Sequence, residues 1–449
     1  MITNWHDKKV LIMGFSISGK SAAKYLAHHG ADVYITEGRE EKPEDKEDLK
    51  ELASLGIKTE FGGHSEEFMK DVYLAIVSPS VPLDSELYKK VKEKNIQIIS
   101  EVELAYKETG KPFIAITGTN GKTTTTALTS HVLSSEYNAP ECGNIGVPPT
   151  SLLDSEVDYF VCELSSFQME HTNSMRAQIA CWTNFTPDHI TWHGTLENYF
   201  NAKAKLFTPP TAAAFAVLNG ADEKLLEFSK TCGGEVFLFD KEAEDNCSYI
   251  KEDAIYFKRR GKEEFIIKLA DCPLIGHHNY QNIMCAVIIA KLIGISNEHI
   301  QERIKDFIVP EHRLEKVREY NGITFYNDSK ATNPEASIVA INSFNDCDVA
   351  LIAGGRDKLT TLEEFCESVK NHIKTVVLIG EAAERFEKEL RASGFDNIIN
   401  ADSLEAAIDK AIELKPDNVL LSPACASFDM FKGYEERGTV FKNYVLSKK

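Results

Sequence analysis

The chain has 449 residues, and its 50 lysines and arginines against 69 aspartates and glutamates give a formal net charge of −19 at pH 7. Length alone predicts about three domains, and the 43% hydrophobic and 27% charged residues are ordinary for a globular protein, which excludes disorder, collagen and coiled coil as descriptions of the whole. The acidic balance argues against a nucleic-acid partner or an anionic membrane partner, because both repel a negatively charged protein.

Neither a membrane span nor an export signal is expected from the sequence. No apolar run approaches the ~18 residues that a spanning helix needs, and residues 1–7 contain no basic segment followed by an apolar stretch. The ten cysteines form no C-x-x-C pair, which is typical of reduced proteins with unpaired thiols. We therefore expect a cytoplasmic protein, and we take it to be a monomer.

Residues 1–100 alternate predicted strands with predicted helices. A turn over Gly14–Gly19 follows the first apolar run and leads into a helix. This alternation predicts a mainly parallel, doubly wound α/β sheet of the Rossmann type. The strands of this segment are predicted at 10–13, 33–36, 74–77 and 96–99.

Two further α/β units follow along the chain. The second opens with the apolar run 113–116, and alternating runs over 232–270 predict an antiparallel excursion before a helix from about Tyr280 to Leu292. The third begins after Pro310. Its strands are predicted at 323–326, 349–352, 376–379 and 419–421. The predicted domains are therefore 1–100, 101–309 and 310–449.

The strongest motif is the segment TGTNGKTT at 117–124, between a predicted strand and a predicted helix. Its glycines let backbone N–H groups converge on phosphate oxygens, its lysine supplies a cation for the β and γ phosphates, and its first threonine after the lysine can ligate Mg²⁺. Ile116 stands where the usual P-loop has a glycine, so the loop is a shortened form. The residues expected to bind ATP here are Gly118, Thr119, Asn120, Gly121, Lys122, Thr123 and Thr124.

The first glycine loop is a weaker signal for a nucleotide. Gly14 and Gly19 fit the dinucleotide fingerprint, but Ser16 takes the place of its middle glycine. Glu37 ends the second predicted strand, where an acid can accept a hydrogen bond from a ribose hydroxyl. A plain turn is an equally good interpretation, and a nucleotide in another pose is favoured over NAD.

Three residues of the second unit are candidates for metal binding. Glu163 ends a predicted strand, where it could reach a Mg²⁺ held by Thr123. His189 lies in a loop after another strand, although a lone loop histidine is more often solvated or a cap. Lys203 lies in a predicted helix, and its local sequence favours an ordinary exposed lysine.

Polar residues later in the chain suggest sites for a purine and for anions. Asn279 and Asn282 share a helix face and could bind a purine edge, or Asn279 could be a helix cap. Arg313 lies at the second joint. Polar loops at 328–333, 354–358 and 422–428 follow strands of one domain, which predicts one site for an anionic substrate, although each alone could be only a turn.

These motifs together resemble the Mur ligase family, over essentially the whole chain. The resemblance implies a Rossmann-like UDP-binding domain, a central P-loop ATPase domain and a C-terminal Rossmann-like domain. The segments that carry it are 117–123, 184–189, 278–282, 312–313 and 328–333. Those most similar to the members that add D-glutamate are 163–168, 354–358 and 422–428.

The resemblance implies an ATP-dependent ligation. ATP would phosphorylate the carboxylate of UDP-N-acetylmuramoyl-L-alanine, and the amine of D-glutamate would then attack the acyl phosphate, in peptidoglycan precursor synthesis. The implied cofactors are ATP, two Mg²⁺ ions and a carbamate formed from CO₂ on Lys203. Such metal ions are needed because two anionic groups must be brought together.

The resemblance also implies a role for each matching residue. Catalytic roles fall on Lys122, Glu163, His189 and Lys203, and the metal ligands would be Thr123, Glu163, His189 and the carbamylated Lys203. Adenine would contact Asn279 and Asn282, the ATP phosphates Arg313 and Lys330, and the ribose Asp328. The UDP substrate would contact Gly14, Ser16, Gly19, Glu37, Asn144 and Ser165. D-Glutamate would contact Thr332, Lys358, Ser427 and Phe428.

Several other functions can be weighed against this one. Another Mur ligase, or a folylpolyglutamate synthase-like ligase, shares the ATP chemistry, but the latter begins at the phosphate loop and leaves the first hundred or so residues unexplained. A nicotinamide dehydrogenase explains Gly14–Glu37 but not the phosphate loop. A non-catalytic nucleotide sensor needs no polar loops in the third domain.

Overall fold

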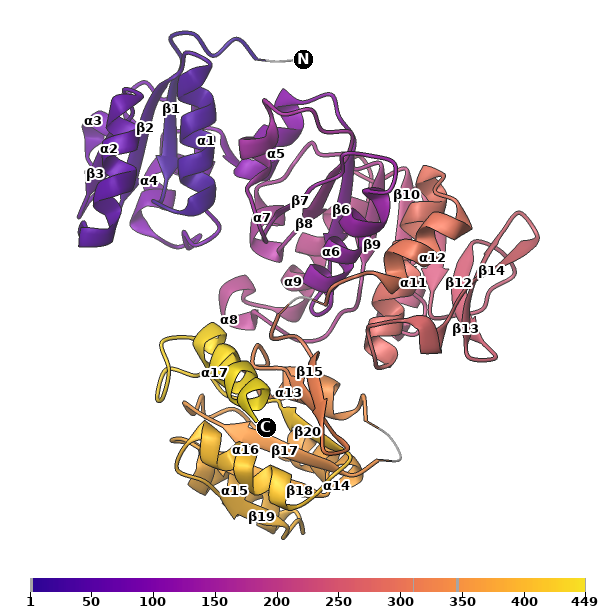
Figure 1. Cartoon of the computed structure of the whole chain (residues 1–449). Helices are drawn as coiled ribbons and strands as arrows, with labels where there is room; N and C mark the ends of the chain where they lie inside the picture. The colour runs from indigo at the N-terminus through magenta and orange to yellow at the C-terminus, as the bar shows by residue number, and fades with distance from the viewer. Residues whose placement is uncertain (1–2, 310, 345–346, 449) are drawn as a thin grey trace. The chain divides into compact units, whose positions relative to one another are not determined.

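A computed structural model of the chain describes residues 3–309, 311–344 and 347–448 (Figure 1). It divides into two compact units, Met1–Cys272 with Gln281–Phe307, and Pro273–Tyr280 with Ile308–Lys449. Each of its three sheets is described by itself below. Residue 310, where a joint was predicted, lies outside the described residues, and the domain boundaries stay predictions. Within the described part, no helix is long and apolar enough to span a membrane.

The first sheet is parallel, with strand order β3-β2-β1-β4-β5. This order matches a doubly wound Rossmann-like sheet. Its elements are β1 (Lys9–Met13), α1 (Ile17–His28), β2 (Asp32–Glu37), η1 (Pro43–Asp45), α2 (Lys46–Ser54), β3 (Lys58–Phe61), α3 (Glu66–Met69), β4 (Leu74–Val77), α4 (Glu86–Glu93), β5 (Ile98–Ser100) and α5 (Glu101–Glu108).

Alternate residues of β1 bury on opposite faces of this sheet. Val10 and Ile12 join one hydrophobic cluster with residues of α1, α2 and α5, and Leu11 and Met13 join another with residues of α3 and α4. A parallel sheet covered on both faces has inner strands that are apolar throughout, which is why β1 and β4 were visible as continuous apolar runs, whereas the half-exposed edge strand β3 was not.

The second sheet has the order β14-β13-β12-β11-β10-β9-β6-β8-β7. Strands β6 to β12 pair in parallel, and the antiparallel pairing is confined to β12, β13 and β14. Its elements are β6 (Phe113–Thr117), α6 (Lys122–Leu133), β7 (Glu141–Gly143), η2 (Pro149–Leu152), β8 (Phe160–Glu163), α7 (Ser166–Glu170), β9 (Ile179–Trp182), α8 (Ile190–His193), α9 (Leu196–Ala204), η3 (Lys205–Phe207), β10 (Phe215–Asn219), α10 (Glu223–Phe228), β11 (Glu235–Phe239), β12 (Cys247–Lys251), β13 (Ala254–Arg259), β14 (Lys262–Lys268), η4 (Leu269–Asp271), α11 (His277–Ile293) and α12 (Asn297–Lys305).

The antiparallel excursion predicted over 232–270 is therefore present, but its strands belong to the second sheet and do not form a separate sheet. Its first strand, β11, pairs in parallel with β10, and the hairpins that follow extend the same sheet. The helix predicted from Tyr280 begins earlier, at His277, as α11.

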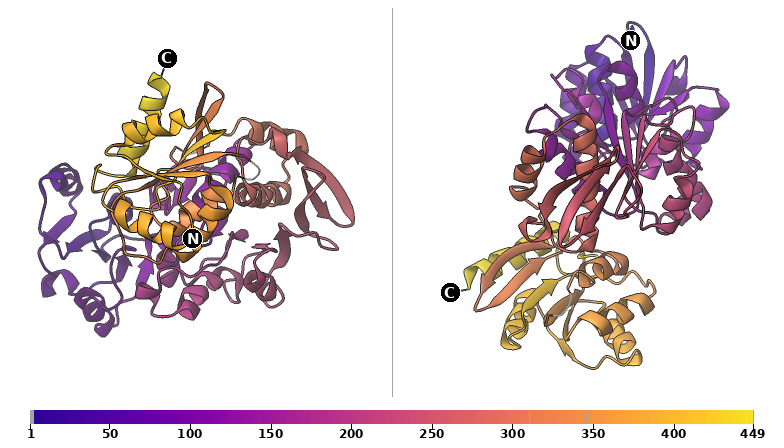
Figure 2. Two further views of the ribbon diagram at one scale, coloured as in Figure 1. Left: turned by 90° about the horizontal axis from the view of Figure 1, so that it is seen from below. Right: turned by 90° about the vertical axis from the view of Figure 1, so that its right-hand side faces the viewer.

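The third sheet has the order β15-β16-β20-β17-β18-β19, parallel except for the first pair. Helices α13 to α15 cover one face and α16 and α17 the other, and the colours of Figure 2 allow these helices to be followed. Its elements are β15 (Glu315–Tyr320), β16 (Ile323–Asn327), α13 (Pro334–Ile341), β17 (Val349–Gly354), α14 (Glu363–His372), β18 (Thr375–Ile379), α15 (Ala383–Ala392), β19 (Ile398–Asn400), α16 (Leu404–Glu413), β20 (Asn418–Leu421) and α17 (Tyr434–Ser447).

Candidate active site

The phosphate loop joins β6 to α6, as the motif predicted. Gly118 and Gly121 have φ angles of +150° and +80°, which residues with a side chain rarely adopt. A Cβ atom on Gly118 would overlap Oγ1 of Thr183. The N–H groups in the first turn of α6 have no partner within the helix, and the helix dipole adds positive potential there. The loop therefore offers an anion site.

A second loop holds the phosphate loop in shape. Asn184 Oδ1 accepts a hydrogen bond from Asn120 N (2.8 Å), and its Nδ2 donates to Asn120 O (3.1 Å). Thr119 N donates to Asn184 O (3.0 Å), and Thr119 Oγ1 donates to Thr186 O (3.1 Å). Sequence reasoning gave Asn184 no role of its own; its position directly after a strand end was the available signal.

Lys203 points into the same loop from α9. Its Nζ donates to Gly118 O (2.7 Å) and lies 3.4 Å from Thr117 Oγ1, and the side chain is only 1% exposed. The interpretation as an exposed lysine is therefore wrong. Burial lowers the pKa of this amine well below its usual range, and the nearby Lys122 lowers it further. Its environment favours the neutral amine.

Lys122 lies over the loop that it follows. Its Nζ donates to Gly118 O (3.0 Å) and to Thr119 O (2.8 Å). Thr123 follows it in the first turn of α6 and is half-buried, and Thr124 is buried. The residues of the phosphate loop predicted to bind ATP are thus placed together.

Glu163 is the last residue of β8 and is 1% exposed. Its Oε1 accepts a hydrogen bond from Asn144 Nδ2 (2.8 Å), whereas its Oε2 is buried with no hydrogen-bond partner within the described part of the chain. An unpartnered buried carboxylate oxygen is costly and fits a cation as its missing partner. Ser165, two residues on, is the N-cap of α7, where its Oγ accepts from Gln168 N (3.3 Å).

His189 stands in a left-handed conformation, with φ of +51°, just before α8. Its ring centroid lies 4.8 Å from that of Phe167, and its Nε2 is 3.2 Å from Asp188 Oδ2. Partial burial lowers the pKa of His189 and outweighs the opposite effect of Asp188. The neutral ring that results could ligate a metal, although the side chain is 45% exposed, as a solvated loop histidine would be.

The four residues expected to be catalytic lie near enough to influence one another electrostatically. Lys122 and Lys203 both lower the pKa of His189, and Glu163 raises that of Lys203. Over the described ranges, no three His, Cys, Asp or Glu side chains could hold a metal ion by themselves. A cation here would need phosphate oxygens as well, which is how proteins usually bind Mg²⁺.

In the first sheet, two of the predicted nucleotide residues, Ser16 and Glu37, form hydrogen bonds that hold the glycine loop in shape. Ser16 is the N-cap of α1, its Oγ accepting from Gly19 N (3.1 Å) and lying 2.8 Å from Ser78 Oγ. Glu37 Oε2 accepts from Phe15 N (2.8 Å). The carboxylate thus stabilises the glycine loop that contains Gly14.

The two asparagines of α11 have separate surroundings. Asn279 Nδ2 donates to Ile275 O (2.7 Å), and Asn282 Oδ1 accepts from Thr125 Oγ1 (3.0 Å) and lies beside Gly121. Because α11 begins at His277, Asn279 lies inside its first turn, and the interpretation of Asn279 as an N-cap is wrong.

Three polar loops of the third sheet follow the adjacent strands β16, β20 and β17. Asp328 accepts from Leu314 N (3.1 Å) and Ser422 Oγ (2.7 Å), and burial raises its pKa to about 7. Ser427 is buried, whereas Lys358 and Phe428 are exposed. The structure places the remaining predicted residues of this sheet in the same loops or beside them: Arg313, Lys330 and Thr332.

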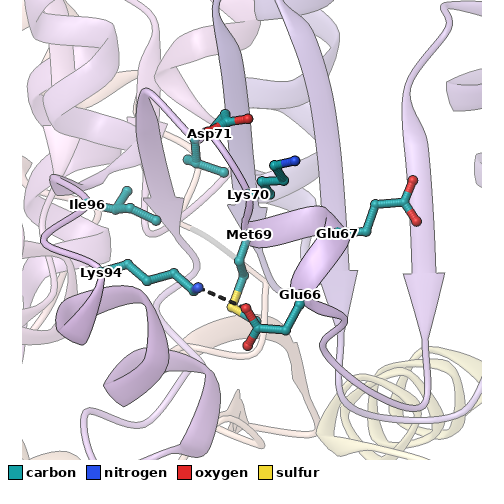
Figure 3. A pocket seen from close by; sticks show the side chains of 8 residues that line it. Glu66, Glu67, Met69, Lys70, Asp71, Lys94 and Ile96 are labelled. Carbon is teal, nitrogen blue, oxygen red and sulfur yellow. Dashed lines mark ion pairs between the residues drawn. The ribbon is translucent and has the colours of Figure 1, made fainter.

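A pocket of about 540 Å³ lies elsewhere, at the amino ends of β4 and β5 (Figure 3). Glu66 and Lys94, which line it, form an ion pair (2.8 Å). Parallel sheets bind their ligands at the carboxyl ends of the strands, so we assign no substrate to this pocket.

Comparison with protein families finds three consecutive matches along the chain. The description "Mur ligase MurD-like, N-terminal domain" matches residues 8–100, "Mur ligase middle domain" matches 116–290, and "Mur ligase, glutamate ligase domain" matches 312–425.

Curated relatives match over nearly the full length. The UDP-N-acetylmuramoylalanine–D-glutamate ligases of Caldanaerobacter subterraneus subsp. tengcongensis and of Thermoanaerobacter sp. are 39% and 40% identical, each over 98% of both chains. Among solved structures, MurF from Acinetobacter baumannii superposes with a TM-score of 0.61 at 16% identity, covering 96% of this chain and 93% of that one. UDP-N-acetylmuramate-alanine ligase from Thermotoga maritima gives 0.59 at 20%, covering 98% and 100%.

Proposed function

The chain belongs to the Mur ligase family, and from this membership we propose that it joins D-glutamate to UDP-N-acetylmuramoyl-L-alanine with ATP in peptidoglycan synthesis. The observation that carries the proposal is the full-length identity of 39–40% to relatives named for this reaction. The phosphate loop and the buried carboxylate of Glu163 supply the groups that such a reaction needs.

ATP would lie with its phosphates on the loop 118–121 and the first turn of α6. The residues fit Mg²⁺ as well, because Glu163 Oε2 is a buried oxygen that has no hydrogen-bond partner among the described residues, and Thr123 offers a hydroxyl close to the phosphate site. Mg²⁺ screens the repulsion between the γ-phosphate and the carboxylate to be phosphorylated. We assign two such ions to Thr123, Glu163, His189 and Lys203.

Lys122 would neutralise charge on the β and γ phosphates while the carboxylate oxygen of the L-alanyl group attacks the γ phosphorus. The bond to ADP breaks, and an acyl phosphate forms. The neutral amine of D-glutamate then attacks the acyl carbon, phosphate leaves, and the amine loses a proton. Asn144, which donates a hydrogen bond to Glu163 Oε1, would orient that carboxylate beside the substrate.

A carbamate on Lys203 completes this proposal. Only the neutral amine attacks CO₂, and burial lowers the pKa of Lys203 so that this form is favoured. The reaction releases a proton and converts a potential cation into an anion. Such a group would supply oxygen ligands beside Glu163, which explains a lysine at a site for Mg²⁺.

The other contacts are assigned as the resemblance implied. Asn279 and Asn282 would bind adenine, Asp328 the ribose, and Arg313 and Lys330 the phosphates of ATP. The UDP substrate would contact Gly14, Ser16, Gly19, Glu37, Asn144 and Ser165, and D-glutamate would contact Thr332, Lys358, Ser427 and Phe428. We place the enzyme in the cytoplasm, as a monomer.

Phosphate release from ATP tests the proposal. We expect release only when UDP-N-acetylmuramoyl-L-alanine and D-glutamate are both present. Release driven by L-glutamate and a folate would indicate a folylpolyglutamate synthase, and release without any amine would discard the proposal. The structure of a Mycobacterium tuberculosis folylpolyglutamate synthase is similar in fold (TM-score 0.55, 16% identity) and covers 76% of this chain. The family match over residues 8–100 favours the Mur ligase reaction instead.

A further inference from the structure

Arg437, near the start of α17, is a buried arginine that no motif singled out. It is 1% exposed, and its guanidinium makes five hydrogen bonds. They run from Nε to Ser329 Oγ (2.9 Å), from Nη2 to Ser329 O (2.8 Å), from Nη1 and Nη2 to Cys425 O (3.1 Å each) and from Nη1 to Ala426 O (3.4 Å). A guanidinium has five N–H donors, so its whole capacity is directed at two loops.

Each of these acceptors is a neutral oxygen. Burying a cation whose hydrogen-bond acceptors are all neutral is expensive, and burial lowers the pKa of Arg437 to about 10, although the carboxyl groups of Asp429 and Asp328 act in the opposite direction. A well-packed apolar side chain often stabilises a protein as much as a buried charge does. The arrangement is therefore better explained by what the guanidinium does to the loops than by a gain in stability.

The two loops are those assigned to ATP and D-glutamate. Ser329 lies between Asp328 and Lys330, and Ala426 precedes Ser427. Ala426 O also accepts from Arg356 N (2.8 Å), which ties in the third loop, 354–358. Gly355 has no room for a Cβ, because that atom would overlap Ala426 O.

The geometry of the peptide bond between Ala426 and Ser427 relates the position of the guanidinium to the direction of the Ser427 N–H. In a trans peptide the carbonyl and the following N–H point in opposite directions. With the carbonyl of Ala426 turned toward Arg437, the N–H of Ser427 is directed away from the guanidinium. An N–H so directed can meet an anionic group on the other side of the loop.

We propose that Arg437 is a positioning residue, whose guanidinium holds the loops of Lys330 and Ser427 at one spacing and directs the N–H of Ser427 toward an anionic group of D-glutamate. The N–H of Lys330 donates to His312 O (3.0 Å), so on that side the guanidinium sets only where the loop that carries the Lys330 side chain lies. The proposal rests on the proposed function, because that function assigns those ligands to the loops.

Arg437→Lys tests it, since lysine keeps the charge but its single ammonium cannot bridge both loops. We expect the KM for D-glutamate and for ATP to rise by about tenfold, and the KM for UDP-N-acetylmuramoyl-L-alanine to change by less than about twofold. The matched control is Arg318→Lys. Among the described residues, Arg318 donates to backbone carbonyls at or just after the other end of α17, those of Val445, Leu446 and Lys448, so the KM values of the variant should match wild type.

A lower kcat with all three KM values unchanged would show only a smaller folded fraction and would overturn the proposal. Hydrogen exchange gives a readout that needs no activity. In Arg437→Lys, peptides covering 327–331 and 423–428 should exchange faster together, whereas the 74–82 segment should not change. Unchanged exchange in both loops would also overturn it. If wild type released no phosphate with D-glutamate, the proposed function would fail, and the exchange data would still decide the role of Arg437.

Discussion

At the scale of single residues, Lys203 has the surroundings of a group that acts as a neutral amine. We expect Lys203→Ala to lose activity by at least about a hundredfold, because the variant cannot supply the carbamate oxygens. A short-chain carboxylic acid should restore part of the phosphate release by taking the place of those oxygens. The measurement is the rate of release against acid concentration.

The control for Lys203 is Lys224→Ala, which removes an exposed lysine whose Nζ lies over the rings of Phe185 and Phe200. This variant should keep wild-type activity. Full activity in Lys203→Ala would reject the carbamate. The amine of Lys203 is neutral only when the pH is above its lowered pKa, and only the neutral amine forms the carbamate. The part of wild-type activity that depends on added CO₂ should therefore fall as the pH is lowered.

The other informative residue is Glu163, whose Oε2 is buried and has no hydrogen-bond partner in the part of the chain that the structure describes. Glu163→Gln keeps the shape and a carbonyl oxygen for Asn144 but removes the charge that would hold a cation. We expect an unchanged or higher Tm and a loss of activity of about a hundredfold or more. Thermal unfolding and phosphate release over a Mg²⁺ titration measure the two effects. If the Glu163→Gln variant were as active as wild type at low Mg²⁺, the role of Glu163 as a metal ligand would be contradicted.

At the scale of elements, Glu101 lies at the start of α5 and reaches η2. Its Oε1 accepts from Thr150 N (2.7 Å), its Oε2 is buried without a hydrogen-bond partner in the described ranges, and burial raises its pKa to about 7. The folded state therefore binds a proton more tightly than the unfolded state. Stability from this group is complete below about pH 4.5 and is lost as the pH rises through about 7, a change of about 3 kcal/mol at most.

Glu101→Gln should remove this loss of stability at high pH and raise, at pH 8, the Tm at which the unit containing Glu101 unfolds. The measured quantity is the difference in Tm between wild type and variant over pH 5 to pH 8.5, in which the similar contribution of Asp328, a residue of the other unit, cancels. Glu86→Gln, on the exposed face of α4 in an ion pair with Lys90, is the control and should leave the pH dependence close to that of wild type. An equal slope in Glu101→Gln and wild type would show that Glu101 does not titrate as described.

At the scale of the whole molecule, the chain consists of two compact units, and the proposed ligands divide between them. All residues assigned to the UDP substrate lie in the first unit, and all those assigned to D-glutamate lie in the second. A ligand that binds only folded protein stabilises its own unit, by about 2.7 kcal/mol at a hundredfold excess over its Kd. We therefore expect two calorimetric transitions.

The UDP substrate should raise one of these transitions and D-glutamate the other. The pH 8 shift of Glu101→Gln identifies the transition of the first unit, because Glu101 belongs to it. A single transition that both ligands raise alike would contradict the division of the sites between the units.

Much of the architecture could be predicted from local sequence. Strands such as 10–13 and 349–352 were visible because a parallel sheet covered on both faces needs continuous apolar runs. Strands β3 and β15 were not predicted, since both are half-exposed edge strands without an apolar run. The phosphate loop was visible because its glycines and lysine are adjacent in the chain, and close spacing limits their geometry strongly.

What the sequence by itself determined was the loops at the strand ends, because these depend on residue types at fixed spacing, and the family and its reaction followed from the resemblance that these motifs carry. Only the tertiary structure decided which polar groups are buried and what they contact. In the structure Lys203 is a buried amine that donates to Gly118 O, and Glu163 Oε2 is buried with no hydrogen-bond partner among the described residues. Arg437 donates to loops about a hundred and about ten residues away along the chain. The physical reason is that burial and hydrogen-bond partners are set by packing between distant segments, and the pKa of each group follows from that packing.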